Sequence, residues 1–136
     1  MLMYTFTGVW IDHANAILAK SNKLGEMTFQ HFHSHVEPHH KSGADDSEHL
    51  TMVNQERGNE RRHNQMKAFC KDIIKAMEGS DEIVIFGPST AKYELKNLLE
   101  DHKVLFAKLK GLETADDMSE AMIKDFMMEY FKLPQD

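Results

Sequence analysis

The chain has 136 residues, of which 41% are hydrophobic and 28% are charged, and its formal net charge is −6. These proportions are typical of one water-soluble domain, and no apolar run approaches the roughly 18 residues that a membrane-spanning helix needs. The acidic balance excludes a uniformly basic nucleic-acid-binding protein, and one cysteine, Cys70, excludes an internal disulfide and a multi-cysteine zinc site. The first residues lack the pattern of a signal peptide. We therefore expect a single domain over residues 1–136, located in the cytoplasm.

The first third of the sequence predicts three antiparallel strands joined by short turns. The strands are expected at residues 4–11, 16–20 and 27–36. In the last of these, Met27, Phe29, His31, His33 and His35 alternate with Thr28, Gln30, Phe32, Ser34 and Val36, as side chains on the two faces of a strand do. Asp12 falls in the first turn, where a carboxylate can accept hydrogen bonds from the backbone N–H groups that follow.

Residues 38–54 contain few apolar anchors and include Pro38 and several histidines. A connection of that length in a compact domain is typical of a mobile loop. A long helix is expected next, over about residues 55–78, because apolar side chains recur there at helical spacing. Gly79 ends it in the manner of a C-terminal glycine cap.

The second half of the chain predicts alternating strands and helices. Residues 83–86 (IVIF) form an uninterrupted apolar run, as in a strand that is covered on both faces. Gly87 and Pro88 end this strand, and Ser89 or Thr90 can cap a following helix. We further expect elements at the ranges that follow: a helix at 89–101, a strand at 103–109 and a final helix at about 116–132, capped by Thr114 or Asp116.

This order of elements, β-β-β-α-β-α-β-α, predicts an α/β fold. Three antiparallel strands followed by right-handed βα crossovers give a mixed five-stranded sheet with helices on its faces. The succession is that of the ribonuclease-H-like fold. In open sheets of this kind, ligands bind at the carboxyl ends of the strands, which directs attention to residues 87–92.

The long predicted helix has two contrasting sides. Met66, Phe69, Cys70, Ile73 and Met77 share one side, and Arg57, Arg61, Lys67, Lys71 and Lys75 share the other. Arg62 falls near the apolar edge, where its side chain must extend to solvent or find a partner. The basic side is either an ordinary solvated surface or a ridge that contacts phosphate groups, and the charge pattern alone leaves both readings open.

Three segments resemble the middle domain of the eukaryotic and archaeal peptide-chain release factors and of Pelota, including bacterial homologues of that family. They are residues 8–20 (GVWIDHANAILAK), 57–73 (RGNERRHNQMKAFCKDI) and 83–99 (IVIFGPSTAKYELKNLL). The family domain has a variant of the ribonuclease-H-like fold. Hydrolytic members carry a Gly-Gly-Gln loop just before the long helix, and this sequence has none, since the region reads HLTMVNQERGNERR.

The resemblance implies a translation-associated protein that does not catalyse peptide release. Pelota-like members also lack the Gly-Gly-Gln motif and act in ribosome rescue. We therefore expect binding to the ribosome or tRNA, through the RNA phosphate backbone and not through DNA, with no cofactor. The residues expected to bind nucleic acid are Arg57, Arg61, Arg62, Lys67 and Lys71.

Two other interpretations stay open. A metal-dependent hydrolase, either a nuclease or a peptidyl-tRNA hydrolase, could use Asp12 with the alternating histidines His31, His33 and His35, although a turn-forming Asp12 and a site without metal are the simpler expectation. A protein-interaction module or homo-oligomer could use the methionine-rich final helix.

Backbone N–H groups at the start of the helix after Gly87-Pro88 offer a simple anion site. Ser89, Thr90 and Lys92 are the residues expected to take part.

Overall fold

The structure is a computed structural model that describes residues 4–34 and 48–134, and side chains in the second segment from residue 60 onward. Five strands form one sheet in the order β3-β2-β1-β4-β5. The strands are β1 (Phe6–Ile11), β2 (Asn15–Ser21), β3 (Met27–His33), β4 (Glu82–Gly87) and β5 (Leu109–Thr114).

The central strand β1 joins the two halves of the sheet. It runs antiparallel to β2, with Val9 opposite Leu18, and parallel to β4, with Val9 opposite Ile85. The outer strand pairs have the same orientations on each side, since β2 and β3 are antiparallel and β4 and β5 are parallel. The mixed five-stranded sheet that the element order predicts is therefore confirmed.

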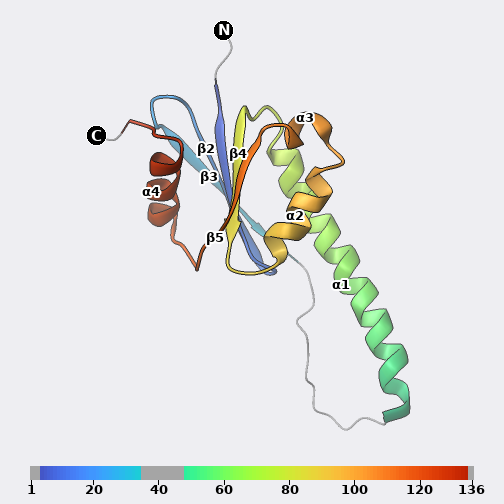
Figure 1. The fold of residues 1–136 in the computed structure, drawn as a ribbon. Coiled ribbons are helices and arrows are strands. Elements are labelled where there is room, and N and C mark those ends of the chain that lie inside the picture. Colours follow the sequence, from blue (N-terminus) through green and yellow to red (C-terminus); the bar gives the residue numbers. More distant parts are fainter. Residues whose placement is uncertain (1–3, 35–47, 135–136) are drawn as a thin grey trace.

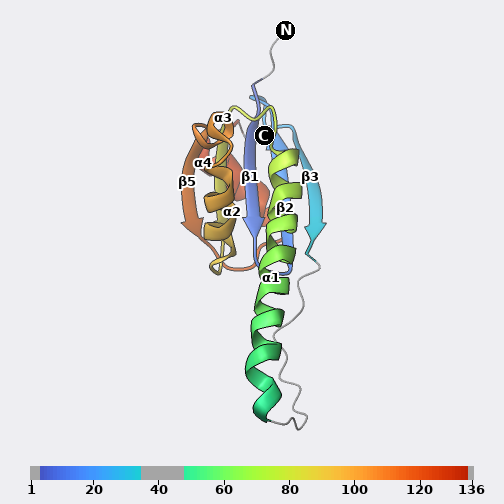
Figure 2. The same ribbon diagram turned by 90° about the vertical axis from the view of Figure 1, so that its right-hand side faces the viewer.

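Helices cover both faces of this sheet, as Figure 1 shows. The helices are α1 (Glu48–Ala76), α2 (Ala91–Leu99), α3 (Lys103–Phe106) and α4 (Glu120–Tyr130). The first three lie on one face and α4 lies alone on the other. Figure 2 shows that only the C-terminal half of α1 lies against the sheet, while its N-terminal half projects beyond the body of the domain.

Alternation along the strands divides the core into two clusters. In β4, Ile83 and Ile85 pack toward α1 and α2, whereas Val84 and Phe86 pack toward α4. All four side chains are fully buried, which confirms the prediction of a strand covered on both faces. Such a strand needs apolar residues at every position, since neither face meets water.

The predicted strand at 103–109 is wrong. Residues 103–106 form the short helix α3, and the fifth strand begins only at Leu109. The apolar run there is short, and a run of this length is compatible with a strand or with one turn of helix. In the helical turn Leu105 is buried in the core, whereas Val104 is 76% exposed.

Two helix starts also differ from the prediction. Helix α4 begins at Glu120, and Ser119, not Thr114 or Asp116, is its N-cap, where the serine hydroxyl accepts a hydrogen bond from the N–H of Met122 at 3.2 Å. Helix α1 begins at Glu48, so the predicted loop at 38–54 is wrong for residues 48–54. The rest of that predicted loop lies outside the described residues.

Candidate functional site

Helix α1 packs on the sheet through the apolar side that the sequence predicts. The residues concerned are Met66, Phe69, Cys70, Ile73 and Met77, and all are buried. They recur every three or four positions, so they line one face of the helix. This contact fixes the rotation of α1 about its axis, and therefore determines which side chains face solvent.

The opposite side of α1 faces solvent and carries basic side chains together with the exposed acids Glu60 and Asp72, and the exposed Glu78 follows its last turn. Lys67, Lys71 and Lys75 are exposed and lie four residues apart, and Arg61 is exposed as well. Arg62 is half-buried, and both Arg61 and Arg62 have interaction partners within the protein. The structure therefore confirms the predicted exposure of the lysines. The side chain of Arg57 lies outside the described residues.

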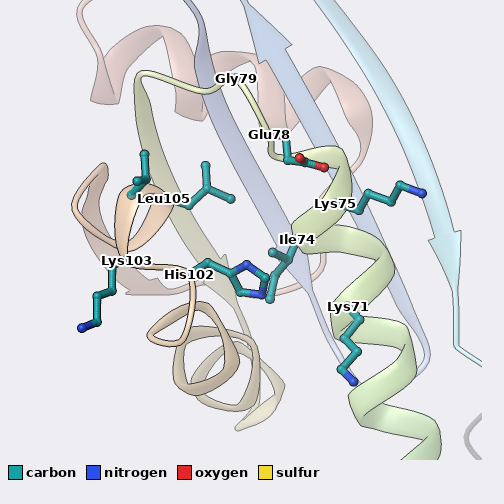
Figure 3. A pocket seen from close by; sticks show the side chains of 9 residues that line it. Lys71, Ile74, Lys75, Glu78, Gly79, His102, Lys103 and Leu105 are labelled. Carbon is teal, nitrogen blue, oxygen red and sulfur yellow. The ribbon is translucent and has the colours of Figure 1, made fainter.

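A hollow of about 680 Å³ opens where the C-terminal end of α1 meets the turn between α2 and α3. Figure 3 shows Ile74 and His102 facing each other across it, with Lys71 and Lys75 on α1 and Lys103 on the other wall. Glu78 is the acidic residue in its lining. The sequence does not indicate this hollow, because the strand predicted at 103–109 leaves no helical turn beside α1. The hollow borders the basic residues of α1 at the C-terminal end of that helix.

A second cluster of polar side chains lies at the carboxyl ends of β1 and β4. After β1 the chain turns toward β2, and after β4 it passes through α2 toward β5, so the two connections diverge from this point. Divergence of this kind creates the crevice in which open α/β sheets bind ligands. Asp12 follows β1 here, and its carboxylate accepts hydrogen bonds from the N–H groups of Ala14 and Asn15 at 2.8 and 2.7 Å. The turn-forming role expected of Asp12 is confirmed.

Ser89, Thr90 and Lys92 lie together at this edge. Thr90 is the N-cap residue of α2 but makes no side-chain cap, and the Ser89 hydroxyl lies 3.5 Å from the N–H of Ala91. Lys92 is only 3% exposed, and its ammonium group donates to the carbonyl oxygen of Ser89 at 2.7 Å. This hydrogen bond from Lys92 fixes the loop that carries Ser89. The anion site expected at these residues stays a prediction.

The histidines of β3 have separate partners. His31 Nε2 lies 2.5 Å from Glu120 on α4, and His33 Nδ1 lies 2.6 Å from the Asn15 side chain. His35 lies outside the described residues. Within the described parts of the chain, no group of three or more His, Cys, Asp or Glu residues is placed to hold a metal ion.

His13 is the histidine that sequence reasoning missed. It lies in the turn after β1, and its ring contacts Glu94 of α2 and the hydroxyl of Ser89. Its position in the sequence could have indicated a role, because His13 closely follows a strand that ends at the ligand-binding edge of the sheet.

Cys70 is an inert buried thiol. It is fully buried, and burial raises its pKa to about 12, with a smaller contribution from the nearby Glu94 carboxylate. Reactive cysteines have lowered pKa values and exposed sulfur atoms, so Cys70 is not a nucleophile. It lines a small pocket of about 180 Å³ between α1 and α2, together with His63.

No helix in the described residues has both the length and the apolar character that crossing a membrane would require.

No protein-family model and no curated protein matches the chain. Among solved structures, the Pelota protein of Thermoplasma acidophilum is 18% identical, and the match has a TM-score of 0.59 over 96% of this chain and 35% of that protein. An archaeal translation termination factor, aRF1, is 12% identical with a TM-score of 0.57 over 95% of this chain and 35% of its own. A structure described as an archaeal protein is 12% identical with a TM-score of 0.56, over 95% of this chain and 34% of its own.

The chain therefore spans about a third of the length of the solved structures that it matches. The predicted resemblance to Pelota and to the archaeal release factor is confirmed at the level of the fold.

Proposed function

We propose that this protein binds the RNA phosphate backbone of the translation machinery, either tRNA or ribosomal RNA, in the cytoplasm and without catalysing peptide release. Handling of stalled ribosomes is the process that suits this activity best. The observation that carries the proposal is the row of exposed lysines on α1, in a fold shared with an archaeal translation termination factor.

The spacing of the lysines suits a polyanion. Lys67, Lys71 and Lys75 are four residues apart, so their positions rise about 6 Å from one to the next along the helix. A row of ammonium groups at this interval can follow a strand of phosphates, and such contacts position nucleic acid without reading its sequence. Arg61 precedes the row on the same helix, and Lys103 lines the far wall of the hollow with its side chain directed away from α1 (Figure 3).

The shape of the domain supports access to a large partner. The N-terminal half of α1 projects from the body, so a bulky RNA can approach the helix without meeting the sheet (Figure 2). The rest of the molecule is acidic, given a net charge of −6 for the whole chain. Repulsion between phosphates and the acidic remainder favours an orientation in which α1 faces the RNA.

The course of α1 supports a role without hydrolysis. Residues 48–60, the region that resembles the segment around the catalytic loop of hydrolytic release factors, are helical from Glu48 onward. Gly58 is the glycine of this region, and no Gly-Gly-Gln sequence accompanies it. A helical backbone lacks the unusual φ values that a glycine pair would permit close to an ester bond.

Ribosome co-sedimentation tests the proposal. The variant carries Lys67→Glu, Lys71→Glu and Lys75→Glu, all at exposed positions. We expect it to leave the ribosomal pellet at salt concentrations at which the natural sequence stays bound, because each reversal replaces an attraction to phosphate with a repulsion.

The control variant changes the net charge by the same amount at exposed lysines elsewhere. It carries Lys110→Glu, Lys124→Glu and Lys132→Glu. This variant should sediment like the natural sequence. If both variants lost ribosome binding equally, the effect would come from overall charge and not from α1. If both variants kept ribosome binding, α1 would not be the binding surface.

A further inference from the structure

Three side chains with complementary chemistry meet at the carboxyl edge of β1 and β4. His13 comes from the β1–β2 turn, Ser89 from the loop after β4, and Glu94 from the first turns of α2. His13 Nε2 lies 2.9 Å from a carboxylate oxygen of Glu94, and His13 Nδ1 lies 3.4 Å from the hydroxyl oxygen of Ser89.

The contacts define the proton positions on the neutral imidazole. An ionised carboxylate only accepts hydrogen bonds, so the contact with Glu94 requires the proton on Nε2. Nδ1 is then an acceptor, and the Ser89 hydroxyl is the donor that faces it. The three groups therefore form a chain: the Ser89 hydroxyl, the His13 imidazole that can accept its proton, and the Glu94 carboxylate that orients the imidazole. Nucleophilic serines are activated by this arrangement.

We propose that Ser89, His13 and Glu94 form an acyl-transfer site that hydrolyses small carboxylic esters, made of other residues than the RNA-binding surface on α1, although Glu94 and Lys67 line the same small pocket. Ser89 is the nucleophile, His13 is the general base and Glu94 is a positioning residue. The Ser89–His13 distance of 3.4 Å is long, and catalytic hydrogen bonds are often loose before substrate binds.

The surrounding structure holds the nucleophile and the base in place. The Ser34 hydroxyl donates to the His13 carbonyl oxygen at 2.7 Å, and the buried ammonium of Lys92 donates to the Ser89 carbonyl oxygen at 2.7 Å. A lysine that is 3% exposed is unusual, because burying an ammonium group carries a large desolvation penalty. Its positive charge near the serine loop stabilises negative charge that develops on a bound carbonyl oxygen.

Backbone donors are also present beside Ser89. Helix α2 begins at Ala91, and the N–H groups of Tyr93 and Glu94 already donate to the Thr90 carbonyl oxygen, which leaves those of Ala91 and Lys92 to be satisfied from outside the helix. The Ala91 N–H lies 3.5 Å from the Ser89 hydroxyl oxygen, so these donors begin beside the reacting group. They can share the oxyanion of a tetrahedral intermediate with the charge of Lys92.

The reaction proceeds in two balanced steps. The Ser89 oxygen bonds to the ester carbonyl carbon and its proton passes to His13 Nδ1; the bond to the alcohol then breaks, and the alcohol leaves with that proton. A water molecule next attacks the acyl group on Ser89 and gives a proton to His13, which returns it to the serine oxygen as the carboxylic acid leaves. The side chains of His13 and Glu94 are 46% and 41% exposed, so a small ester in solution can reach the site.

The first test uses a fluorophosphonate probe and 4-nitrophenyl acetate on the purified full chain. We expect the probe to label Ser89, located by peptide mass spectrometry, and ester hydrolysis to fall at least tenfold in Ser89→Ala and His13→Gln. His31→Gln is the matched control, because His31 also pairs with a glutamate, and it should keep full activity. Labelling elsewhere, or equal hydrolysis by Ser89→Ala, would overturn the proposal.

The second test measures the base directly. In Ser89→Cys, the new thiol should react with iodoacetamide faster than a free thiol, and adding His13→Gln should slow it several-fold. Cys70 gives no background because it is fully buried. If the alkylation rate of the Ser89→Cys thiol did not depend on His13, the imidazole would not activate residue 89.

The role of Glu94 has its own spectroscopic test. Nitrogen-15 NMR should show His13 protonated on Nε2 in the natural sequence and a mixture of tautomers in Glu94→Gln. An unchanged tautomer, or full esterase activity in Glu94→Gln, would refute a positioning role. Ribosome binding should persist in Ser89→Ala, so failure of this site and failure of the proposed RNA binding give different results.

Discussion

The close approach of β4 to the parallel strand β1 at Gly87 is the feature of the fold that a single methyl group should disturb most. A Cβ atom added at Gly87 would lie 2.1 Å from the carbonyl oxygen of Ile11. Unstrained contacts between carbon and oxygen begin at about 3.3 Å, so the overlap exceeds 1 Å by this reckoning. Gly87 is also paired with Thr114 of β5, so β4 cannot simply move away from β1.

We expect Gly87→Ala to lower the free energy of unfolding by about 3 kcal/mol, the upper end of the range for overpacked sites, because the obstacle is backbone. Gly8→Ala is the matched comparison. Its added Cβ would lie 2.2 Å from the sulfur of Met127, the far part of a flexible side chain that can rotate away. We therefore expect a smaller loss there, of about 1 kcal/mol.

Urea unfolding followed by the fluorescence of Trp10 measures both variants. Trp10 is the single tryptophan and is buried on β1, between the two strands that flank it. If the variants and the natural sequence have equal m-values, the differences between their unfolding midpoints report differences in stability. Gly87→Ala with natural stability, or a greater loss in Gly8→Ala than in Gly87→Ala, would refute the reasoning.

Three further predictions concern single groups. Ser119→Ala should lower the free energy of unfolding by about 1 kcal/mol in the same urea assay, since the N-cap of α4 is lost; Ser119→Thr should lose less, and no loss would contradict the cap. The thiol of Cys70, with its pKa raised to about 12 by burial, should resist iodoacetamide at pH 8 until urea unfolds the protein; rapid alkylation of the native protein would contradict its burial. Tyr4 donates to Glu82, which raises the pKa of the Tyr4 phenol to about 12. Because this value exceeds the ordinary value of 10.0, the stability that the bond contributes is complete below pH 10 and is lost as the pH rises to 12; Tyr4→Phe should flatten that part of the pH profile.

Much of the sheet could be predicted because its residues repeat simple patterns. Residues 83–86 are apolar throughout, and only a strand with both faces covered buries such a run. The start of α1 was harder to predict, because the residues between Glu48 and Asn54 include few apolar anchors. Helix α3 was missed because three apolar residues in a row satisfy a strand pattern and a helical turn equally well.

The two candidate sites differed in how far the sequence revealed them. The lysines of α1 could be grouped from helical geometry alone, since all lie on one element. His13, Ser89 and Glu94 lie on three segments that only the parallel pairing of β1 with β4 brings together. Lys92 was expected to face an anion, but the fold buries its ammonium against the Ser89 carbonyl, which no local pattern indicates.

The salt dependence of RNA binding tests the central claim most directly. For labelled tRNA or a ribosomal RNA fragment, the logarithm of the binding constant should fall linearly with the logarithm of salt concentration. Reversing Lys67, Lys71 and Lys75 should reduce the size of that slope by about 2 to 3, since each phosphate contact contributes about 0.7 to 0.9. An unchanged slope in this variant, or natural protein that binds neither RNA at low salt, would contradict the assignment of α1 as an RNA-binding surface.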